Sequence, residues 1–514
     1  MKNFMELKPL IIDLDDLAPV ENRKWHDPSG YQGLYAFHKY WGKKPHELLA
    51  FIIERMSSRG EVVVDPFVGS GTAAREALLL GRRFIGCDIN PVAIELTKLL
   101  SSPPNAREIE DNFDIVTNYA KARIMETYRT ISPPNTASHF LWEGNTIKQV
   151  WHTTNGRKIT KLEPTAHDLN LSKKFEGYKS SLISSPQFFT NTRINAGPDL
   201  NLNDLFTDRA IHNIDLLLEA IQTLPLEQQK ILMLCLTAAS GQMSKMVFAV
   251  TNRGKRRGET SSKVEVGSWV IGYWRPPTRF EVNVWNCFSR RVEKLISALA
   301  TADPLTGTQI ANNCNSVISG NHSVFVGCMD CRELLANLPH NSIDLIITDP
   351  PHSDRIPYLE LSAMWNSLLS RDVNYKEEIV VSNAKERGKV LTNYTADIQE
   401  VINKMALVLK PSGIIVFLFN ARSSTDWAAL QPFIAPEDST IPKTLHYIGS
   451  FPAQYSAGSV IQDNREGGLK YDYALVFSRN SEKMLTKEYR ATLSEIPGWS
   501  KQAPSIVSSA GTTA

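Results

Sequence analysis

EVVVDPFVGSGTAAREALLLGRRFIGCDIN, residues 61–90, predicts a strand, a glycine turn, a helix and a second strand that ends on an acid. The valine run at 62–64 suits a buried parallel strand, and the turn at 69–71 lets a ligand approach the backbone closely. The second strand delivers Asp88 to its carboxyl end. Ligands bind at this edge of open α/β sheets, and an acid about 20 residues after a glycine turn suits a ribose diol. We therefore expect a nucleoside-cofactor site.

The glycine turn fits neither of two common phosphate-binding patterns. A dinucleotide-binding fold needs GxGxxG and a P-loop needs GxxxxGK[ST], and no Lys follows Gly71. DPFVGSGT, residues 65–72, resembles instead the first motif, DPFxGSGT, of S-adenosylmethionine-dependent amino-methyltransferases that act on DNA. The alternative is an ordinary βα turn whose glycines serve only packing. The resemblance implies S-adenosyl-L-methionine as cofactor, bound by Asp65, Pro66, Phe67, Gly69, Ser70, Gly71, Thr72 and Asp88.

The composition is that of a globular protein. The chain has 514 residues, 42% of them hydrophobic and 21% charged, which predicts about two to four domains. Its net charge is +2, so contact with nucleic acid must come from local basic patches. The six cysteines are too scattered for a disulfide framework, and the CxxC pair at 328–331 lacks further ligands for zinc. Because no signal peptide or bilayer-length apolar run is evident, we expect a cytoplasmic protein.

An aromatic and basic cluster at residues 22–46 precedes the glycine turn. Its position resembles the tenth motif of the same methyltransferases, which closes over the methionine end of the cofactor. The resemblance places Lys43 or Lys44 against the cofactor carboxylate or a DNA phosphate, and an exposed aromatic loop is the alternative. Pro45 predicts the start of a helix that leads into the strand at Val62.

The alternation of strands and helices stops between residues 105 and 320. Helices are predicted over about 108–129, 203–223 and 226–249, and Asn155-Gly156 predicts a hairpin. We interpret this block as a mainly helical insertion and as the DNA- or target-recognition region.

Two features of the insertion suit nucleic acid. A basic stretch at 251–263 either follows DNA phosphates or is a solvated loop; its basic residues are Arg253, Lys255, Arg256 and Arg257. Large aromatic residues follow, and they more often fill a hydrophobic seam than stack on bases; they are Trp269, Tyr273, Trp274 and Trp285. Neither feature predicts a recognition sequence.

The α/β pattern returns at residue 322. A strand at 324–327, a helix at 331–338 and a strand at 343–348 deliver the tetrapeptide at 349–352 to the carboxyl edge of the sheet. The remaining predicted elements are helices over 358–369 and about 395–409 and strands over 414–419, about 444–451 and 471–478.

Asp349-Pro350-Pro351-His352 matches the [DNS]PP[YFWH] motif of methyltransferases that modify exocyclic amino groups, with His352 where Tyr or Phe is usual. An aromatic amine is a poor nucleophile because its lone pair is delocalised into the ring. The Asp349 carboxylate and the Pro350 carbonyl would accept its two N–H groups and free that lone pair, while the prolines keep the turn rigid. The ring of His352 would stack on a flipped-out base. A turn without a catalytic role is the alternative.

Over residues 35–100 and 320–480, the chain resembles bacterial and phage DNA amino-methyltransferases. The resemblance implies a Rossmann-like class I methyltransferase sheet, with Asp330 near the cofactor adenine. It implies methylation of adenine N6 in double-stranded DNA, and it allows a restriction or phage-defence partner. Cytosine-N4 methylation, an RNA guanine-amino methyltransferase and a non-catalytic cofactor-binding regulator are the alternatives.

The insertion is expected before the third strand, whereas the commonest arrangement with this motif order places it after that strand. The expected divisions are an N-terminal segment (1–34), a first methyltransferase part (35–104), the insertion (105–320), a second methyltransferase part (321–482) and a flexible tail (483–514).

Overall fold

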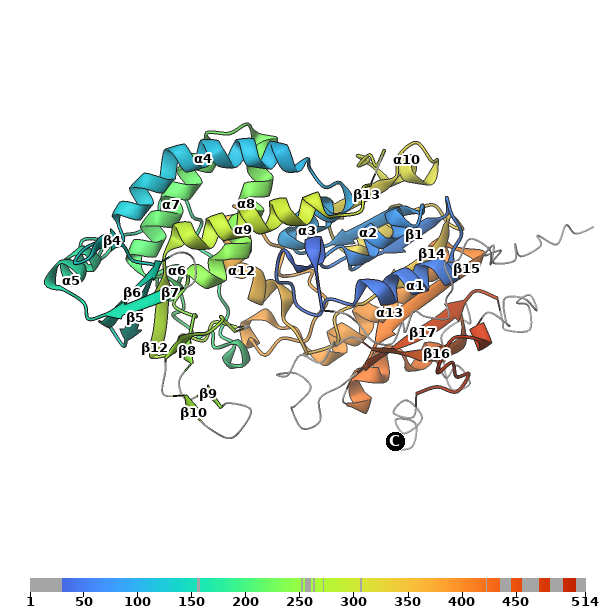
Figure 1. Cartoon of the computed structure of the whole chain (residues 1–514). Coiled ribbons are helices and arrows are strands. Elements are labelled where there is room, and N and C mark those ends of the chain that lie inside the picture. Colours follow the sequence, from blue (N-terminus) through green and yellow to red (C-terminus); the bar gives the residue numbers. More distant parts are fainter. Residues whose placement is uncertain are drawn as a thin grey trace, which may run out of the picture.

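The computed structural model describes residues 30–154, 158–250, 253–254, 260–261, 264–270, 272–305, 307–421, 423–434, 445–454, 471–480 and 493–504. The expected turn at Asn155-Gly156 and the basic residues Lys255, Arg256 and Arg257 lie outside these residues. The described chain is mixed α/β, with a large sheet towards one end and long helices with a smaller sheet towards the other (Figure 1). None of the described helices is both long and apolar enough to cross a membrane.

A mainly parallel, seven-stranded sheet organises the first of these regions. Its order is β13-β2-β1-β14-β15-β17-β16, and β17 runs antiparallel to both of its neighbours. The strands are β1 (Val62–Asp65), β2 (Arg83–Asp88), β13 (Val324–Cys328), β14 (Ile343–Thr348), β15 (Leu409–Phe419), β16 (His446–Gln454) and β17 (Tyr471–Ser478). All seven were predicted from the sequence, and the observed bounds of β14 and β17 equal the predicted ones.

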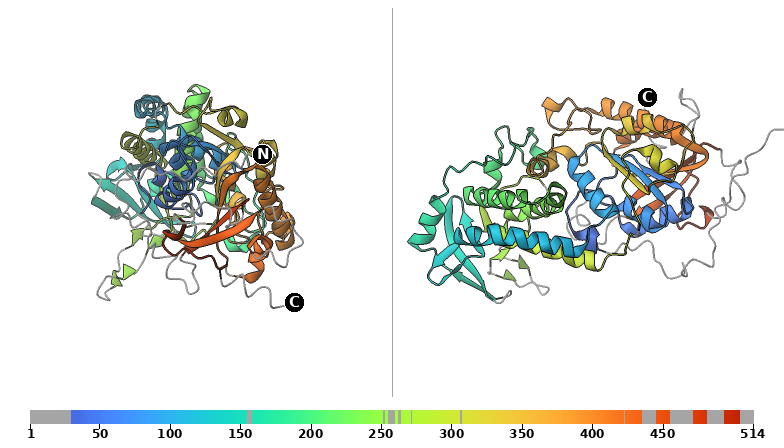
Figure 2. Two further views of the ribbon diagram at one scale, coloured as in Figure 1. Left: turned by 90° about the vertical axis from the view of Figure 1, so that its right-hand side faces the viewer. Right: turned by 90° about the horizontal axis from the view of Figure 1, so that it is seen from above.

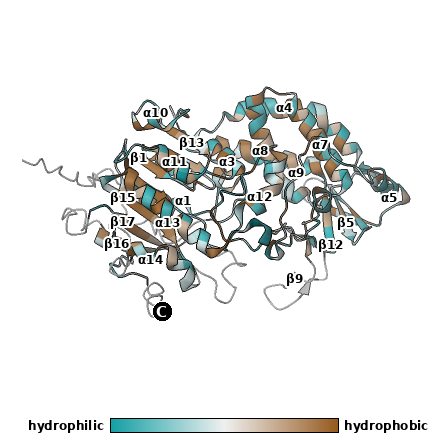
Figure 3. Cartoon of the chain, turned by 180° about the vertical axis from the view of Figure 1, so that it is seen from behind, coloured by the Kyte–Doolittle hydropathy of each residue, from teal (hydrophilic) through white to brown (hydrophobic). Residues whose placement is uncertain are grey.

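Strand β1 is an interior strand of the sheet, next to the middle strand β14, and its valines are buried on both faces. It pairs in parallel with β2 on one side and with β14 on the other, where Val63 lies opposite Leu345. All four of its residues are buried, as a parallel strand covered on both faces requires. The strands of this sheet are predominantly hydrophobic in Figure 3.

Helices cover both faces of the sheet. On one face β1 packs with α1 (His46–Met56) and α2 (Thr72–Leu79), and on the other with α11 (Cys331–Asn337) and α13 (Leu391–Val408). The remaining helices of this region are α3 (Pro91–Ser101), α10 (Cys314–Ile318), α12 (Tyr358–Leu368), α14 (Gln431–Ile434) and the 3-10 turns η2 (Gly33–Ala36), η4 (Lys385–Arg387) and η5 (Ser424–Ala429).

The block between α3 and β13 contains four long helices and a second sheet. The helices are α4 (Ala106–Glu126), α7 (Asp208–Gln222), α8 (Leu226–Met243) and α9 (Val284–Ala300). The sheet has the order β12-β5-β6-β7 and consists of β5 (His139–Glu143), β6 (Thr146–Thr154), β7 (Lys158–Leu162) and β12 (Thr278–Val282). Seen from above, it lies at the end of the molecule away from the seven-stranded sheet (Figure 2, right).

Short elements complete this block. They are β3 (Arg129–Ile131), β4 (Pro134–Thr136), α5 (Ala166–Lys173), η3 (Thr192–Ile194), α6 (Leu202–Leu205), β8 (Ala249–Val250), β9 (Arg253–Gly254), β10 (Thr260–Ser261) and β11 (Glu265–Val266). Strands β9 and β10 pair antiparallel on either side of the basic residues at 255–257.

Sequence reasoning located the helices of this block better than its strands. The hairpin at Asn155-Gly156 is supported by the antiparallel pairing of β6 with β7, but β5 and β12 were missed. The third predicted helix ends at Met243 instead of 249, because the chain then turns to join the second sheet, where Val247 O accepts from the N–H of Phe280.

Two further expectations concern side-chain burial. Trp269, Tyr273 and Trp285 are buried, as expected for a hydrophobic seam, whereas Trp274 is 40% exposed.

The predicted flexible tail is wrong for residues 493–504. Leu493 and Ile496 of this segment are buried against the sheet, and Ser500 bridges to Ser450 of β16.

The glycine turn tolerates no side chain at Gly71, which provides a test of the fold. Gly71 has φ 82°, and a Cβ there would lie 2.6 Å from Cα of Thr97 in α3. We expect Gly71→Ala to lower the free energy of unfolding by about 2–5 kcal/mol, from left-handed strain and steric overlap together. Urea unfolding followed by tryptophan fluorescence measures this change.

Gly60→Ala is the matched control, because Gly60 has φ 80° but open space around its Cβ position. Its cost should be limited to the strain of about 1–2 kcal/mol. Equal losses in the two variants would contradict the close contact of the turn with α3.

Candidate active site

The two sequence motifs meet at the carboxyl ends of adjacent strands. Asp65 ends β1 and Asp349 directly follows β14, and these two strands pair in parallel. The hydroxyl of Thr348 donates to Asp65 Oδ1 over 2.8 Å, and the N–H of Phe67 donates to the same oxygen over 2.9 Å. The glycine turn and the Asp-Pro-Pro-His turn therefore lie side by side on one edge of one sheet.

A pocket, partly open to solvent, lies at this edge. The predicted site residues that line it are Lys43, Asp65, Pro66, Phe67, Gly69, Ser70, Thr72, Asp88, Asp330, Asp349 and Pro351. Gly71, Pro350 and His352 are not among its lining residues.

Asp88 is fixed at the pocket by the backbone. Its Oδ2 accepts from the N–H of Gly69 and its Oδ1 from the N–H of Asn90, each over 2.9 Å. Burial raises the pKa of Asp88 to about 6, although these two N–H groups act in the opposite direction. The acid at the end of β2 is thus tied to the glycine turn and faces the cavity, as the sequence predicted.

Asp330 caps the helix that follows β13. Its Oδ1 accepts from the N–H of Arg332, and the guanidinium of Arg332 also pairs with Asp330, Glu377 and Asp397. The Asp330 carboxylate lines the pocket, and the guanidinium of Arg332 neutralises its charge.

The segment before α1 forms the opposite wall of the pocket. Tyr40 lies over the glycine turn, because a Cβ on Gly69 would be 3.3 Å from its ring. The hydroxyl of Tyr40 accepts from Asn90 Nδ2 over 3.3 Å, and Asn90 also donates to Ser362 of α12. Tyr40 thus packs on the glycine turn, and Phe37 and Trp41 of the same cluster are buried, whereas Tyr31 is 39% exposed.

The two lysines of this segment both line the pocket, and each contacts other groups of the protein. Lys43 Nζ donates to the carbonyls of Tyr35 and His38, and burial lowers the pKa of this amine to about 7. Lys44 Nζ lies 2.7 Å from Asp349 Oδ2 and 2.9 Å from Asp472 Oδ2. Two buried carboxylates require a counter-charge, and Lys44 supplies it, so its ammonium faces the Asp-Pro-Pro-His turn.

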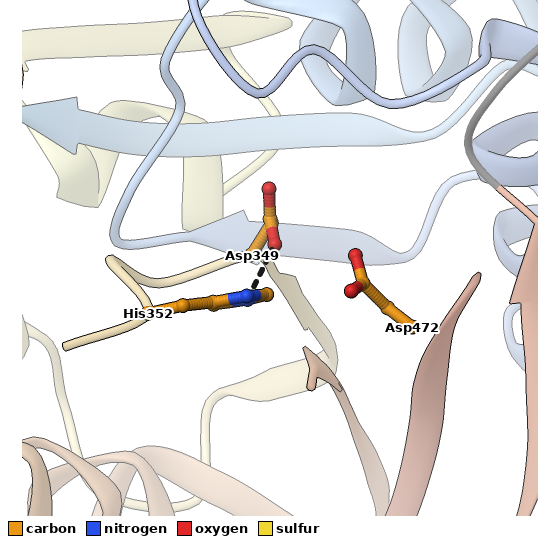
Figure 4. Close-up of side chains that lie close together, drawn as sticks. All are labelled: Asp349, His352 and Asp472. Atoms are coloured by element: carbon orange, nitrogen blue, oxygen red, sulfur yellow. Dashed lines mark ion pairs between the residues drawn. The ribbon is translucent and has the colours of Figure 1, made fainter. Parts of the chain in front are cut away.

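Asp349 is an ionised acceptor at the edge of the pocket. Burial alone would raise the pKa of its carboxyl, but Lys44 and His352 outweigh burial and lower that pKa below its ordinary value. Its side chain keeps 21% exposure, and His352 Nε2 lies 3.1 Å from Oδ1 (Figure 4). An ionised carboxylate only accepts hydrogen bonds, which suits a partner that brings N–H groups.

His352 faces into the protein. Its side chain is 5% exposed, Nε2 also lies 3.2 Å from the carbonyl oxygen of Leu418, and its ring contacts that of Phe419 with centroids 4.7 Å apart. The expected stacking surface is therefore turned towards strand β15 instead of the pocket.

Sequence reasoning missed Asp472, Arg355 and Asn90. Asp472 is fully buried on β17, and the acid in the apolar run YDYALVF was the available signal, because an acid in a central strand needs a partner. Arg355 follows the tetrapeptide by three residues, and its Nη1 lies 3.6 Å from Asp472 Oδ1. The amide of Asn90 carried no such signal.

Asp65 gives the site a pH-dependent stability. Burial raises its pKa from 3.8 to about 7, against the hydrogen bonds from Phe67 and Thr348. The folded state therefore binds this proton more tightly than the unfolded state, and the contribution of Asp65 to stability falls as pH rises from about 4 to about 7.

Asp65→Asn should remove this loss, because an amide oxygen still accepts both hydrogen bonds and carries no charge. We expect the free energy of unfolding of the variant, relative to wild type, to grow by up to about 1.4 kcal/mol per pH unit across that window. Urea titrations at pH 4.5, 6 and 7.5, chosen to span roughly that window, measure the difference. Parallel curves for the two proteins would contradict the raised pKa.

Comparison with known proteins finds similarity in the amino-terminal part of the chain. Residues 15–99 match a family described as DNA methylase, N6_N4_Mtase. The type II methyltransferase M1.MboII of Moraxella bovis is 51% identical over 47 residues, 9% of this chain and 18% of that protein. Type II methyltransferase M2.DpnII of Streptococcus pneumoniae is 42% identical over 60 residues, 12% and 22% of the two chains.

The DNA adenine methyltransferase YhdJ of Escherichia coli strain K12 is 35% identical over 77 residues, 15% of this chain and 26% of that protein. The chain thus matches about a fifth to a quarter of the length of these curated relatives. The family match contains the glycine turn and Asp88, and the predicted resemblance to bacterial DNA amino-methyltransferases is confirmed there.

Proposed function

We propose that this protein transfers a methyl group from S-adenosyl-L-methionine to the exocyclic amino group of a base in double-stranded DNA, with adenine N6 as the preferred acceptor. One observation carries the proposal: the glycine turn after β1 and Asp349 after β14 line one pocket at the carboxyl ends of adjacent parallel strands. The DNA methylase match over residues 15–99 supports it.

The strand order supports a Rossmann-like class I methyltransferase sheet. Six strands run in one direction, and β17 runs antiparallel between β15 and β16. The glycine turn and Asp349 follow the adjacent interior strands β1 and β14. In this proposal residues 35–104 and 321–482 form the methyltransferase domain, and residues 105–320 form the target-recognition region. A cognate restriction or phage-defence partner stays a prediction from the resemblance.

The residues around the pocket fit the proposed cofactor. Gly69 and Gly71 have positive φ and open the backbone at the start of α2, and the Asp88 carboxylate suits the ribose hydroxyls. Asp330 would lie near the adenine, and Tyr40 and Phe67 supply aromatic surface. When bound, the cofactor supplies an electrophilic methyl group on a sulfonium.

The chain's own part in the reaction is to hold the amine. Asp349 stays ionised beside Lys44, so it can accept one N–H of the target amine, and the rigid Pro350 carbonyl would accept the other. Both acceptors draw the nitrogen away from conjugation with the ring and fix its direction of attack. A base inside a duplex cannot reach the edge of this sheet, so we infer that it is flipped out.

Methyl transfer is tested with tritiated S-adenosylmethionine and mixed-sequence duplex DNA. We expect wild-type protein to label DNA, and digestion to nucleosides to give N6-methyl-2′-deoxyadenosine as the labelled product. Asp349→Ala should lower the rate at least about 100-fold, because removing a group that acts mainly in the transition state lowers kcat. Labelled N4-methyl-2′-deoxycytidine would instead identify cytosine as the methylated base, and label in RNA alone would contradict the DNA substrate.

A binding measurement distinguishes the proposed cofactor-binding role of Asp88 from the proposed catalytic role of Asp349. Asp88→Ala should weaken binding of S-adenosylhomocysteine by about 10- to 100-fold, because two charge-assisted hydrogen bonds are lost. Asp349→Ala should bind it within about threefold of wild type, since Asp349 serves the base. Isothermal titration of both variants checks this, and equal weakening would contradict the division of roles.

A further inference from the structure

We propose that His352 is a positioning residue for Asp349 and not a stacking surface for the base. It acts within a closed ring of five side chains, Asp472, Lys44, Asp349, His352 and Arg355, of which Asp472, Lys44 and His352 are buried. The inference rests on the proposed function for its catalytic consequence, whereas the ring itself is a property of the fold.

The ring closes through five contacts. Asp472 Oδ2 lies 2.9 Å from Lys44 Nζ, which lies 2.7 Å from Asp349 Oδ2. Asp349 Oδ1 lies 3.1 Å from His352 Nε2, and His352 Nδ1 lies 3.1 Å from Arg355 Nη1. Arg355 Nη1 returns to Asp472 Oδ1 at 3.6 Å. Figure 4 shows Asp349, His352 and Asp472 converging from the tetrapeptide and from β17.

The partners of His352 determine its tautomer. A guanidinium only donates hydrogen bonds, so Nδ1 beside Arg355 accepts and Nε2 carries the proton. That N–H donates to the carbonyl oxygen of Leu418, and Asp349 Oδ1 lies 3.1 Å from the same nitrogen. One edge of the imidazole thus holds the catalytic carboxylate, and the other is fixed by Arg355.

Each oxygen of Asp349 therefore has its own anchor. Lys44 lies against Oδ2 and His352 against Oδ1, and these two contacts limit the rotation of the carboxylate. A carboxylate oxygen has two lone-pair sites, so Oδ2 can still accept an N–H from the target amine beside Lys44.

Burial argues against stacking. The side chain of His352 is 5% exposed and its ring lies against Phe419, whereas a stacking residue must present a free face to the base. The departure from Tyr or Phe at this position is thereby explained, because neither residue has a nitrogen to bridge Asp349 and Arg355.

Three variants at position 352 distinguish positioning from stacking. Gln offers two N–H groups for the two acceptors but no ring, whereas Phe keeps a ring against Phe419 but has no donor. We expect His352→Phe to lower kcat by about 10- to 100-fold at unchanged cofactor affinity, and His352→Gln to lower it by less than about fivefold. His352→Tyr should resemble Phe.

The reverse order, with Phe or Tyr at least as active as Gln, would overturn the proposal. Loss through KM for DNA with kcat kept would do the same, because it indicates lost base contacts. His340→Phe and His340→Gln, at an exposed position away from the site, provide matched controls. Thermal unfolding of every variant separates lost function from lost folding.

A second readout does not depend on activity. In ¹⁵N-histidine-labelled protein, with His352→Gln used to assign the signal, Nε2 of His352 should carry the proton and Nδ1 should accept. Arg355→Met should remove the shift that the hydrogen bond imposes on Nδ1. Protonation at Nδ1 would overturn the ring even if the wild-type protein failed to methylate DNA, and such a failure alone would refute only the proposed function.

Discussion

The parallel pairing of β1 with β14 is the constraint on which the site depends. Val63 and Val64 fix its register against Leu345 and Ile346, and both strands are buried between two layers of helices. A parallel register aligns the carboxyl ends of the strands, so the glycine turn and the Asp-Pro-Pro-His turn emerge together. The hydrogen bond from Thr348 to Asp65 joins the two ends directly.

Buried charge is the second constraint, and it follows from the first. Aligning these strand ends brings Asp65, Asp88 and Asp349 to one pocket, where burial disfavours their ionised forms. The protein resolves this differently at each position. Asp88 accepts hydrogen bonds from backbone N–H groups, and Asp65 accepts one from the Thr348 hydroxyl and one from a backbone N–H. Of these three carboxylates, only Asp349 receives a full positive charge, from Lys44. The carboxylate that accepts the target amine in the proposed function is therefore the one held ionised.

Much of the site could be predicted from the sequence because its parts are local. A valine strand, two glycines and an acid define the cofactor edge within 30 residues, and the tetrapeptide follows a strand whose bounds were predicted without error. The orientation of Lys44 could not be predicted, because its partners Asp349 and Asp472 lie far along the chain. The inward turn of His352 depends on Leu418 and Phe419, which also carry no local signal.

The position of the insertion has a consequence for biosynthesis. About 280 residues separate the end of β1 from the start of β14, so β1 leaves the ribosome long before its partner strand β14 is synthesised. At about 5–20 residues per second this interval lasts about 15–60 s. Throughout it the nascent chain presents an unpaired, valine-rich strand edge, a template for wrong association. We expect the helices between α3 and β13 to assemble first, and chaperones to shield this edge until β14 arrives.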